Sequence, residues 1–229
     1  MAAPALALRD VTFHWPGRDT FGLRVPDFQL AAGESVLLLG ESGSGKSTLL
    51  SLICGIVTPD AGEIQIAETR LSGLRAGARD RLRAERIGVI FQQFNLLPYA
   101  SVSDNILLPL RFAPERRGRS EQGDAARLCS ALGLPDDVLQ AKAGRLSVGQ
   151  QQRVAVARAL IGQPPLIVAD EPTSALDAAT QDGFMGLLFD QLAATGSSLL
   201  MVSHDERLGA RFDRVVRVED ILLRESRAA

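Results

Sequence analysis

The stretch GESGSGKST, residues 40–48, has the residue types and the spacing that bind phosphate groups. It follows an apolar run and fits the pattern G-x-x-x-x-G-K-[ST] between a strand and a helix. The glycines let backbone N–H groups turn inward around phosphate oxygens, Lys46 supplies a positive charge, and Ser47 offers a hydroxyl to Mg²⁺. A flexible glycine turn is the alternative, but pattern and context together favour a site for nucleotide phosphates.

A second apolar stretch, LIVADE at 166–171, ends in two acids. Asp170, at the carboxyl end of the predicted strand, is suited to organise Mg²⁺. Glu171 projects in another direction and is suited to polarise or deprotonate an attacking water. Alone, the two acids would be a surface pair; beside a phosphate loop, they indicate a hydrolytic site.

The segment RLSVGQQQRV, residues 145–154, opens a predicted helix with a small hydroxyl and a glycine. This is the chemistry of an anion-binding helix N-terminus, because free N–H groups and the helix dipole both favour negative charge. The obvious phosphate loop lies far upstream, so the residues alone leave open which anion this helix serves.

The elements that carry these residues alternate between apolar strands and helical stretches. Continuous apolar runs suit strands buried on both faces of a parallel sheet, so the pattern predicts an α/β fold with crossovers. The predicted strands are 6–15, 23–30, 34–40, 63–67, 87–92, 166–170 and 197–204, and the predicted helices are 46–55, 75–86, 148–162 and 177–194.

Residues 93–153 contain no convincing buried strand, and we interpret them as a helical insert in the α/β core. Within the insert, the charged stretch APERRGRSEQG at 113–123 is predicted to be a solvated surface connection. The arginine-rich helix at 75–86 contains interspersed acids, which favour one solvated helix face over a basic patch.

The composition is that of a globular chain, with 46% of its 229 residues hydrophobic, 23% charged and a net charge of -2. A nucleic-acid binder would usually be basic, so we expect no nucleic-acid partner. Cys54 and Cys129 form no paired motif, which argues against a disulfide framework or a zinc site. No apolar run reaches the ~20 residues of a membrane helix, and the first residues lack signal-peptide features. We therefore expect a cytoplasmic protein that meets a membrane only through a partner.

The segment RLSVGQQQRVAVARAL, residues 145–160, resembles the signature segment of ATP-binding-cassette (ABC) ATPases and its following helix. Six motifs follow the order of that family over nearly the whole chain: GESGSGKST (Walker A), Gln92 in IFQQFNLLP (Q-loop), LSVGQ (signature), LIVADE (Walker B), SALD at 174–177 (D-loop) and His204 in VSHD (switch histidine). The resemblance implies an α/β fold: a P-loop NTPase (RecA-like) core with an N-terminal antiparallel β subdomain and an inserted α-helical subdomain. Residues 1–229 would form one ABC nucleotide-binding domain, with 93–153 as the helical subdomain.

The resemblance also implies roles for individual residues, with ATP and Mg²⁺ as cofactors. Lys46, Glu171 and His204 would be catalytic, and Ser47, Gln92 and Asp170 would serve the metal ion. Trp15 would stack on the adenine, with anchoring of a β-turn as the alternative. The expected nucleotide-binding residues are Trp15, Gly40, Glu41, Ser42, Gly43, Ser44, Gly45, Lys46, Ser47, Thr48, Gln92, Ser147, Gly149, Gln150, Asp170 and Asp177.

In the family pattern, two subunits dimerise head to tail and sandwich two ATPs, so the partner here would be a second nucleotide-binding subunit, expected to be an identical copy. Ser147 and Gly149 would contact the γ-phosphate held by the other subunit, and Asp177 would lie at the same interface. Val148 departs from the usual LSGGQ. A positive φ at this position would strain a branched side chain, whereas a negative φ would tolerate it, and the sequence leaves both open.

The stretch IGVIFQQFNLLP at 87–98, with SVSDNILLPL downstream, resembles the lipoprotein-release and macrolide-export group of ABC ATPases. That resemblance implies an ATPase subunit that drives a separate integral membrane permease through region 92–112, peripheral on the cytoplasmic face of the inner or plasma membrane. An amino-acid importer ATPase and a cell-division regulatory ATPase that signals instead of transporting are the alternatives.

Overall fold

The computed structural model describes residues 3–15, 22–41, 43–174 and 176–225. The chain divides into two compact units, one of residues 1–83 with 198–229 and the other of residues 84–197. The boundaries predicted for the helical subdomain, 93–153, stay a prediction. Within the described ranges, no helix combines the length and the apolar content that crossing a bilayer requires.

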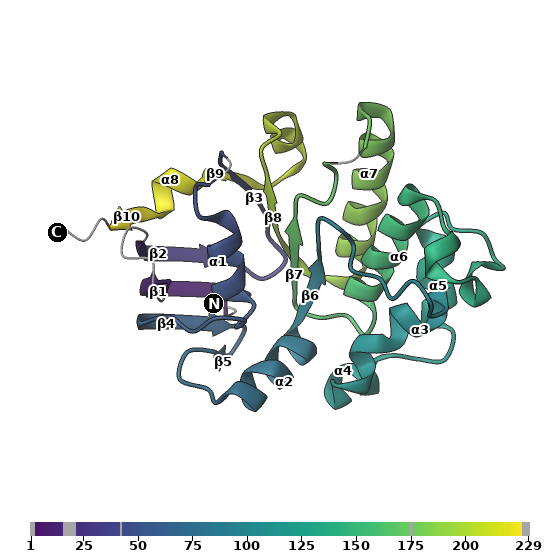
Figure 1. Ribbon diagram of the computed structural model, residues 1–229, viewed down its shortest axis with the longest axis horizontal. Coiled ribbons are helices and arrows are strands. Elements are labelled where there is room, and N and C mark those ends of the chain that lie inside the picture. The colour runs from purple at the N-terminus through teal and green to yellow at the C-terminus, as the bar shows by residue number, and fades with distance from the viewer. Residues whose placement is uncertain (1–2, 16–21, 42, 175, 226–229) are drawn as a thin grey trace. The chain divides into compact units, whose positions relative to one another are not determined.

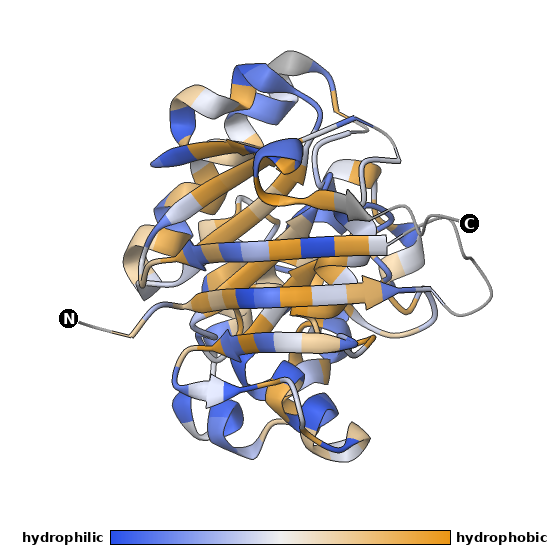
Figure 2. Ribbon diagram, turned by 90° about the vertical axis from the view of Figure 1, so that its left-hand side faces the viewer, coloured by the Kyte–Doolittle hydropathy of each residue, from blue (hydrophilic) through white to orange (hydrophobic). Residues whose placement is uncertain are grey.

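The first unit contains an antiparallel sheet in the strand order β10-β2-β1-β4-β5. In the pair formed by β1 and β2, the register runs from Leu6 opposite Leu30 to His14 opposite Gly22. Figure 2 faces this sheet and shows hydrophilic and hydrophobic residues alternating along its strands, as expected where one face is covered. The strands are β1 (Leu6–His14), β2 (Gly22–Leu30), β4 (Ala61–Ile66), β5 (Thr69–Arg70) and β10 (Leu223–Glu225).

The same unit contains a parallel group in which β3 (Ser35–Leu39) pairs with β8 (Ser198–Ser203) and β9 (Arg214–Arg217). All five residues of β3 are buried, which explains its continuous apolar run. Helix α1 (Lys46–Ile53) follows β3, and the short helix α8 (Val218–Ile221) follows β9. Helix α2 (Ala76–Arg86) lies where predicted, but Glu85 near its end is buried, so its face is only partly solvated.

The second unit contains β6 (Ile87–Ile90) paired in parallel with β7 (Leu166–Asp170), and the helices that Figure 1 shows around them. The side chains of Ser101, Ser147 and Asp177 cap three of these helices, because each accepts a hydrogen bond from a backbone N–H in the first turn. The helices are α3 (Val102–Leu107), α4 (Pro114–Arg119), α5 (Asp124–Ala131), α6 (Val148–Leu160) and α7 (Ala178–Thr195).

The prediction of a solvated connection at 113–123 holds for most of its side chains, which are exposed, but is wrong for Ala113 and Arg116, which are buried. Helix α4 occupies part of this stretch, and Arg116 is 1% exposed. Its guanidinium donates to five backbone carbonyls, those of Ala84, Ile87, Arg158, Ala159 and Ile161. Burial foremost, and then the charge of Arg119, lower the pKa of Arg116 to about 10 against the opposing effect of Glu85, so the side chain remains a cation at neutral pH.

Candidate functional site

The predicted phosphate loop turns between β3 and α1. Gly43 and Gly45 have φ of 80° and 104°, which only glycine adopts without strain. Lys46 is 8% exposed, and its Nζ donates to the carbonyls of Gly40 (2.6 Å) and Glu41 (2.7 Å). The loop therefore folds around the ammonium group, and Gly45 leaves the start of α1 without a side-chain cap.

The loop also holds an unpartnered hydroxyl. Among the described residues, Ser44 Oγ is the one buried side-chain oxygen or nitrogen with no hydrogen-bond partner. A Cβ at position 40 would lie 2.8 Å from this oxygen and 3.1 Å from Val218 Cβ, so the close packing here favours glycine. An orphaned buried donor costs about 1–3 kcal/mol, and a phosphate oxygen would relieve that cost. The donor set of the loop therefore fits a nucleotide phosphate.

Trp15 lies beside the start of α1. Its indole Nε1 donates to Thr48 Oγ1 at 3.2 Å, and its ring meets Phe13 edge-on at 5.1 Å between centroids. Trp15 and Thr48 are 33 residues apart in the sequence, and this hydrogen bond joins them within the first unit. This places an aromatic ring next to the phosphate loop.

The acidic residues follow β7 in the second unit. Asp170 ends the strand, and Glu171 has a φ of 42°. A non-glycine residue in this region costs of order 1–3 kcal/mol and persists only where its surroundings hold it. The Glu171 carbonyl accepts from the N–H of Ser174 at 3.2 Å, so Glu171 opens a tight turn.

The Q-loop residue Gln92 lies just after β6, and its Nε2 reaches Ser174 Oγ at 3.5 Å. Ser174 opens the D-loop motif, so two motifs that are distant in sequence meet in the second unit. Phe94 and Asn95 follow with φ of 58° and 48°. Arg158 of α6 donates to both of their carbonyls, which stabilises the strained pair.

Sequence reasoning missed Arg158. It is 8% exposed, and desolvation lowers its pKa. The signal was a lone arginine within the otherwise apolar run AVARAL, where a charged side chain must either leave the core or find acceptors.

The signature segment opens α6 with a capping box. Ser147 Oγ accepts from Gln150 N at 3.3 Å, and Gln150 Oε1 accepts from Ser147 N at 3.0 Å. Val148 is the first residue of the helix, has a negative φ and is 54% exposed. A Cβ at Gly149 would contact nothing within 4 Å. The question about Val148 is therefore answered: its backbone is helical and the branched side chain is not strained.

Because Val148 is not strained, Val148→Gly is expected not to stabilise the protein. The variant should lose roughly 0.5 kcal/mol of stability, the difference in helix propensity between the two residues. Thermal unfolding measures the effect. A variant that is more stable than the wild type would show that the valine is strained after all.

The other predicted residues lie at element ends. Asp177 caps α7, with Oδ1 accepting from Thr180 N at 3.0 Å. His204 follows β8 and is exposed. Ser42 lies outside the described residues. The phosphate loop, Trp15 and His204 belong to the first unit, and the remaining predicted residues belong to the second.

No group of three or more His, Cys, Asp or Glu side chains in the described part of the chain is arranged to hold a metal ion. Mg²⁺ keeps several waters and binds proteins through one or two ligands plus substrate phosphates. The Ser47 hydroxyl next to the phosphate loop fits that mode of binding, in which the nucleotide supplies part of the coordination.

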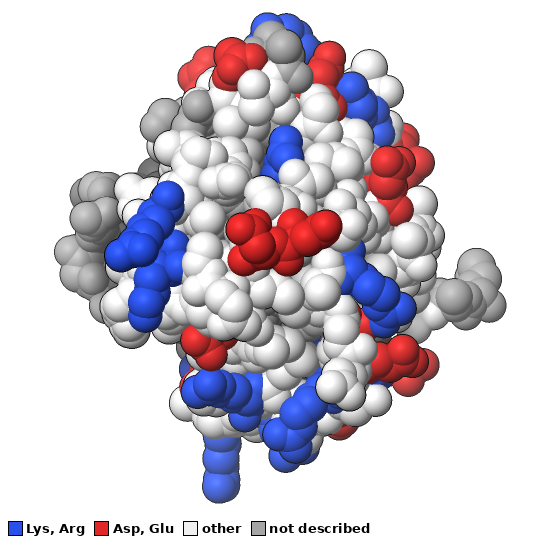
Figure 3. Space-filling model, turned by 90° about the vertical axis from the view of Figure 1, so that its right-hand side faces the viewer, with Lys and Arg blue, Asp and Glu red and all other residues white. Residues whose placement is uncertain are grey.

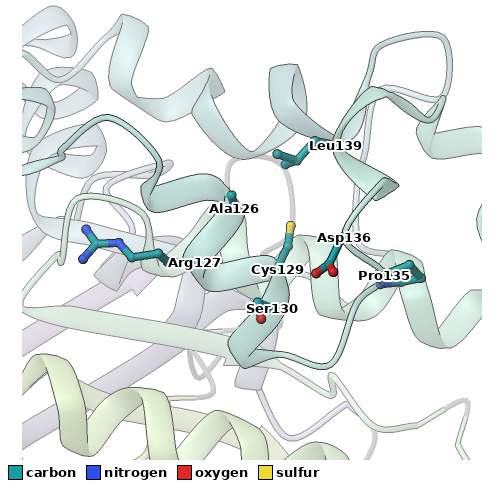
Figure 4. Close-up of a pocket in the computed structure, with 7 residues that line it drawn as sticks. All are labelled: Ala126, Arg127, Cys129, Ser130, Pro135, Asp136 and Leu139. Carbon is teal, nitrogen blue, oxygen red and sulfur yellow. The ribbon is translucent and has the colours of Figure 1, made fainter.

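A cavity of about 320 Å³ opens beside α5 (Figure 4). It is lined by Ala126, Arg127, Cys129, Ser130, Pro135, Asp136 and Leu139. Burial raises the pKa of the Cys129 thiol to about 11, so the thiol is protonated at neutral pH and is a poor nucleophile. The cavity therefore adds no reactive group to the candidate site.

The comparisons with known proteins agree with this geometry. The family model described as ABC transporter matches residues 23–174. The lipoprotein-releasing system ATP-binding protein LolD of Novosphingobium aromaticivorans is 40% identical over 225 residues, which cover 97% of this chain and 100% of that protein. The macrolide export ATP-binding/permease protein MacB of Hyphomonas neptunium is 40% identical over 96% of this chain, which spans 34% of that longer protein.

A solved structure gives the same result for the fold. The dimeric structure of a post-hydrolysis state of the ATP-binding cassette MJ0796, bound to ADP and Pi, aligns with a TM-score of 0.77 at 33% identity, covering 98% of this chain and 100% of that one. The predicted P-loop fold with an antiparallel β subdomain is confirmed. The chain belongs to the ABC transporter family, in which it is an ATP-binding cassette that hydrolyses ATP.

Proposed function

We propose that this cassette is the ATPase subunit of a membrane complex of the lipoprotein-release and macrolide-export type. The observation that carries the ATPase part is the phosphate loop, in which Lys46 is buried among loop carbonyls and Ser44 holds an unpartnered hydroxyl. The similarity to LolD over that protein's whole length supports the assignment to this group.

Binding of ATP would begin at this loop. The Lys46 ammonium exchanges its carbonyl acceptors on Gly40 and Glu41 for β- and γ-phosphate oxygens, which bind a cation more strongly. Ser44 Oγ donates to a phosphate, and Trp15 stacks on the adenine. Ser47, Gln92 and Asp170 would hold Mg²⁺, which supplies charge neutralisation of the phosphates.

Hydrolysis would use the acid at the turn after β7. On the family pattern, Glu171 accepts a proton from the water whose oxygen attacks the γ-phosphorus, while the bond to the bridging oxygen breaks and ADP leaves. His204 keeps the water and phosphate in register. The left-handed backbone of Glu171 supports this role, because strained residues cluster at sites where the strain aims a side chain.

A second copy of the chain would complete each nucleotide site. The N-terminus of α6, with Ser147 and Gly149, would donate to the γ-phosphate bound by the partner, and Gln150 and Asp177 would lie at that interface. The exposed start of α6 and the dimeric state of the cassette MJ0796 support this arrangement. ATP thereby favours the closed dimer, and hydrolysis loosens it.

The membrane subunit would dock on region 92–112. This region exposes Tyr99 (72%), Leu107 (37%) and Phe112 (65%), a set of large apolar side chains that a partner helix can cover. The cassette would then lie on the cytoplasmic face of the inner or plasma membrane. On the face shown in Figure 3, acidic and basic side chains are interspersed, unlike the basic surface that a nucleic-acid partner requires.

Glu171→Gln tests the proposed function. The variant should bind ATP but hydrolyse it at least about 10²-fold more slowly, because the general base is gone. Light scattering in the presence of ATP should then detect a stable dimer. Glu68→Gln, a change of the same chemistry at an exposed position, should behave as the wild type. Hydrolysis by Glu171→Gln at the wild-type rate would remove Glu171 from the mechanism.

A further inference from the structure

The turn that presents Glu171 is held from three directions. Three glutamine amides, from α6, from α7 and from the loop after β6, donate to three consecutive residues of the turn. Gln152 of α6 donates to the Pro172 carbonyl at 2.6 Å, Gln181 of α7 donates to Thr173 Oγ1 at 3.1 Å, and Gln92 donates to Ser174 Oγ at 3.5 Å.

Among these three, Gln152 makes the shortest bond and is the most buried, at 1% exposure. Its acceptor is a backbone carbonyl, so the bond acts directly on the path of the chain. The ring of Pro172 already fixes its φ, and fixing its carbonyl also fixes its ψ. The Glu171–Pro172 peptide plane is then fixed relative to the peptide plane that follows it.

Glu171 itself needs such support. A residue before proline is restricted towards extended backbone, yet Glu171 has a φ of 42°. The hydrogen bond from Ser174 N to the Glu171 carbonyl closes the turn, but at 3.2 Å it is weaker than the bond that Gln152 makes. Groups outside the turn therefore add to its support, and Gln152 makes the shortest of the three glutamine bonds to the turn.

We propose that Gln152 is a positioning residue for ATP hydrolysis: from the signature helix, it holds the Pro172 carbonyl and so keeps the Glu171 carboxylate aimed at the attacking water. The proposal rests on the proposed role of Glu171 as general base. Gln152 lies on the second turn of α6, whose first residues are the proposed contact with the partner's nucleotide. Helix α6 rigidly joins Ser147 and Gln152. Contact of Ser147 with the ATP bound by the partner therefore also fixes Glu171 in the chain to which Ser147 belongs.

Gln152→Met tests the proposal, because methionine fills a similar volume and has no donor. We expect kcat for ATP hydrolysis to fall roughly tenfold, the worth of a buried hydrogen bond. The KM for ATP and the fluorescence change of Trp15, the chain's single tryptophan, should stay at wild-type values, because the phosphate loop is untouched. Gln191→Met, the same change on α7 away from the turn, should leave all three unchanged.

A double variant separates positioning from a general structural role. If Gln152 acts through Glu171, Gln152→Met combined with Glu171→Gln should hydrolyse ATP no more slowly than Glu171→Gln alone. An additive further loss would overturn the proposal. Should Gln152→Met unfold at lower temperature, Gln152→Glu, which keeps the shape and replaces the donor by an acceptor, should show the same loss of kcat at unchanged KM.

The kcat values of Gln152→Met and Glu171→Gln together distinguish a wrong role for Gln152 from a wrong role for Glu171. Wild-type kcat in Gln152→Met, together with an inactive Glu171→Gln, would overturn the positioning role and leave Glu171 as the base. A rise of KM together with a fall of kcat, with loss of the Trp15 signal, would show that Gln152 supports the fold as a whole and would equally overturn the proposal.

Discussion

Replacing Lys46 with alanine is expected to abolish ATP binding in the micromolar range and to lower hydrolysis by at least about 10³-fold, as removal of a phosphate-stabilising charge does. The variant loses the one buried cation of the loop, and the carbonyls of Gly40 and Glu41 lose their donor. Both losses act on the same nine-residue stretch, 40–48, in which Lys46 is the one cationic residue. Titration of Trp15 fluorescence with ATP and release of phosphate measure the two effects.

Lys142→Ala is the matched control, because Lys46 and Lys142 are the two lysines of the chain. Lys142 is exposed, and its Nζ donates to the Tyr99 carbonyl at 2.8 Å. Its loss should change ATP binding and hydrolysis little. Micromolar affinity in Lys46→Ala, with thermal unfolding as in the wild type, would contradict the phosphate-loop interpretation.

The sequence predicts the buried strands well, because strands such as β3 and β7 are apolar on both faces and leave a continuous pattern. It also predicts the turn of the phosphate loop, because Gly43 and Gly45 adopt positive φ there, and the start of α6, because Ser147 caps that helix. Strand β9 was not predicted, since it lies at the edge of its sheet with every side chain at least partly exposed, and its sequence RVVR leaves no long apolar run.

The supporting side chains of the site are the part that the sequence does not reveal. Gln152 and Arg158 act on backbone carbonyls, which every residue offers, so no pattern in the sequence identifies their partners. Arg158 meets Asn95 across 63 residues, and Arg116 meets Ile161 across 45. Such contacts depend on the tertiary fold. A charged stretch such as 113–123 is therefore predicted to be a surface loop even where one of its arginines is buried.

Arg116→Met is expected to cost the second unit about 3–5 kcal/mol of unfolding free energy, the usual result of removing one member of a buried charged network. Methionine keeps the apolar stem but donates to none of the five carbonyls that Arg116 serves. The Glu85 carboxylate, 4% exposed, would remain buried with less positive charge near it. Urea unfolding measures the loss.

Arg117→Met supplies the control, because Arg117 is the exposed neighbour on the same helix and its substitution should change stability by no more than about 0.5 kcal/mol. Three of the five acceptors of Arg116 lie at the carboxyl end of α6 or just after it, so the variant should also loosen the helix that carries the signature segment at its other end. Equal stability of the two variants would mean that the carbonyls find other donors or water, and that the buried guanidinium does not fix the position of α6.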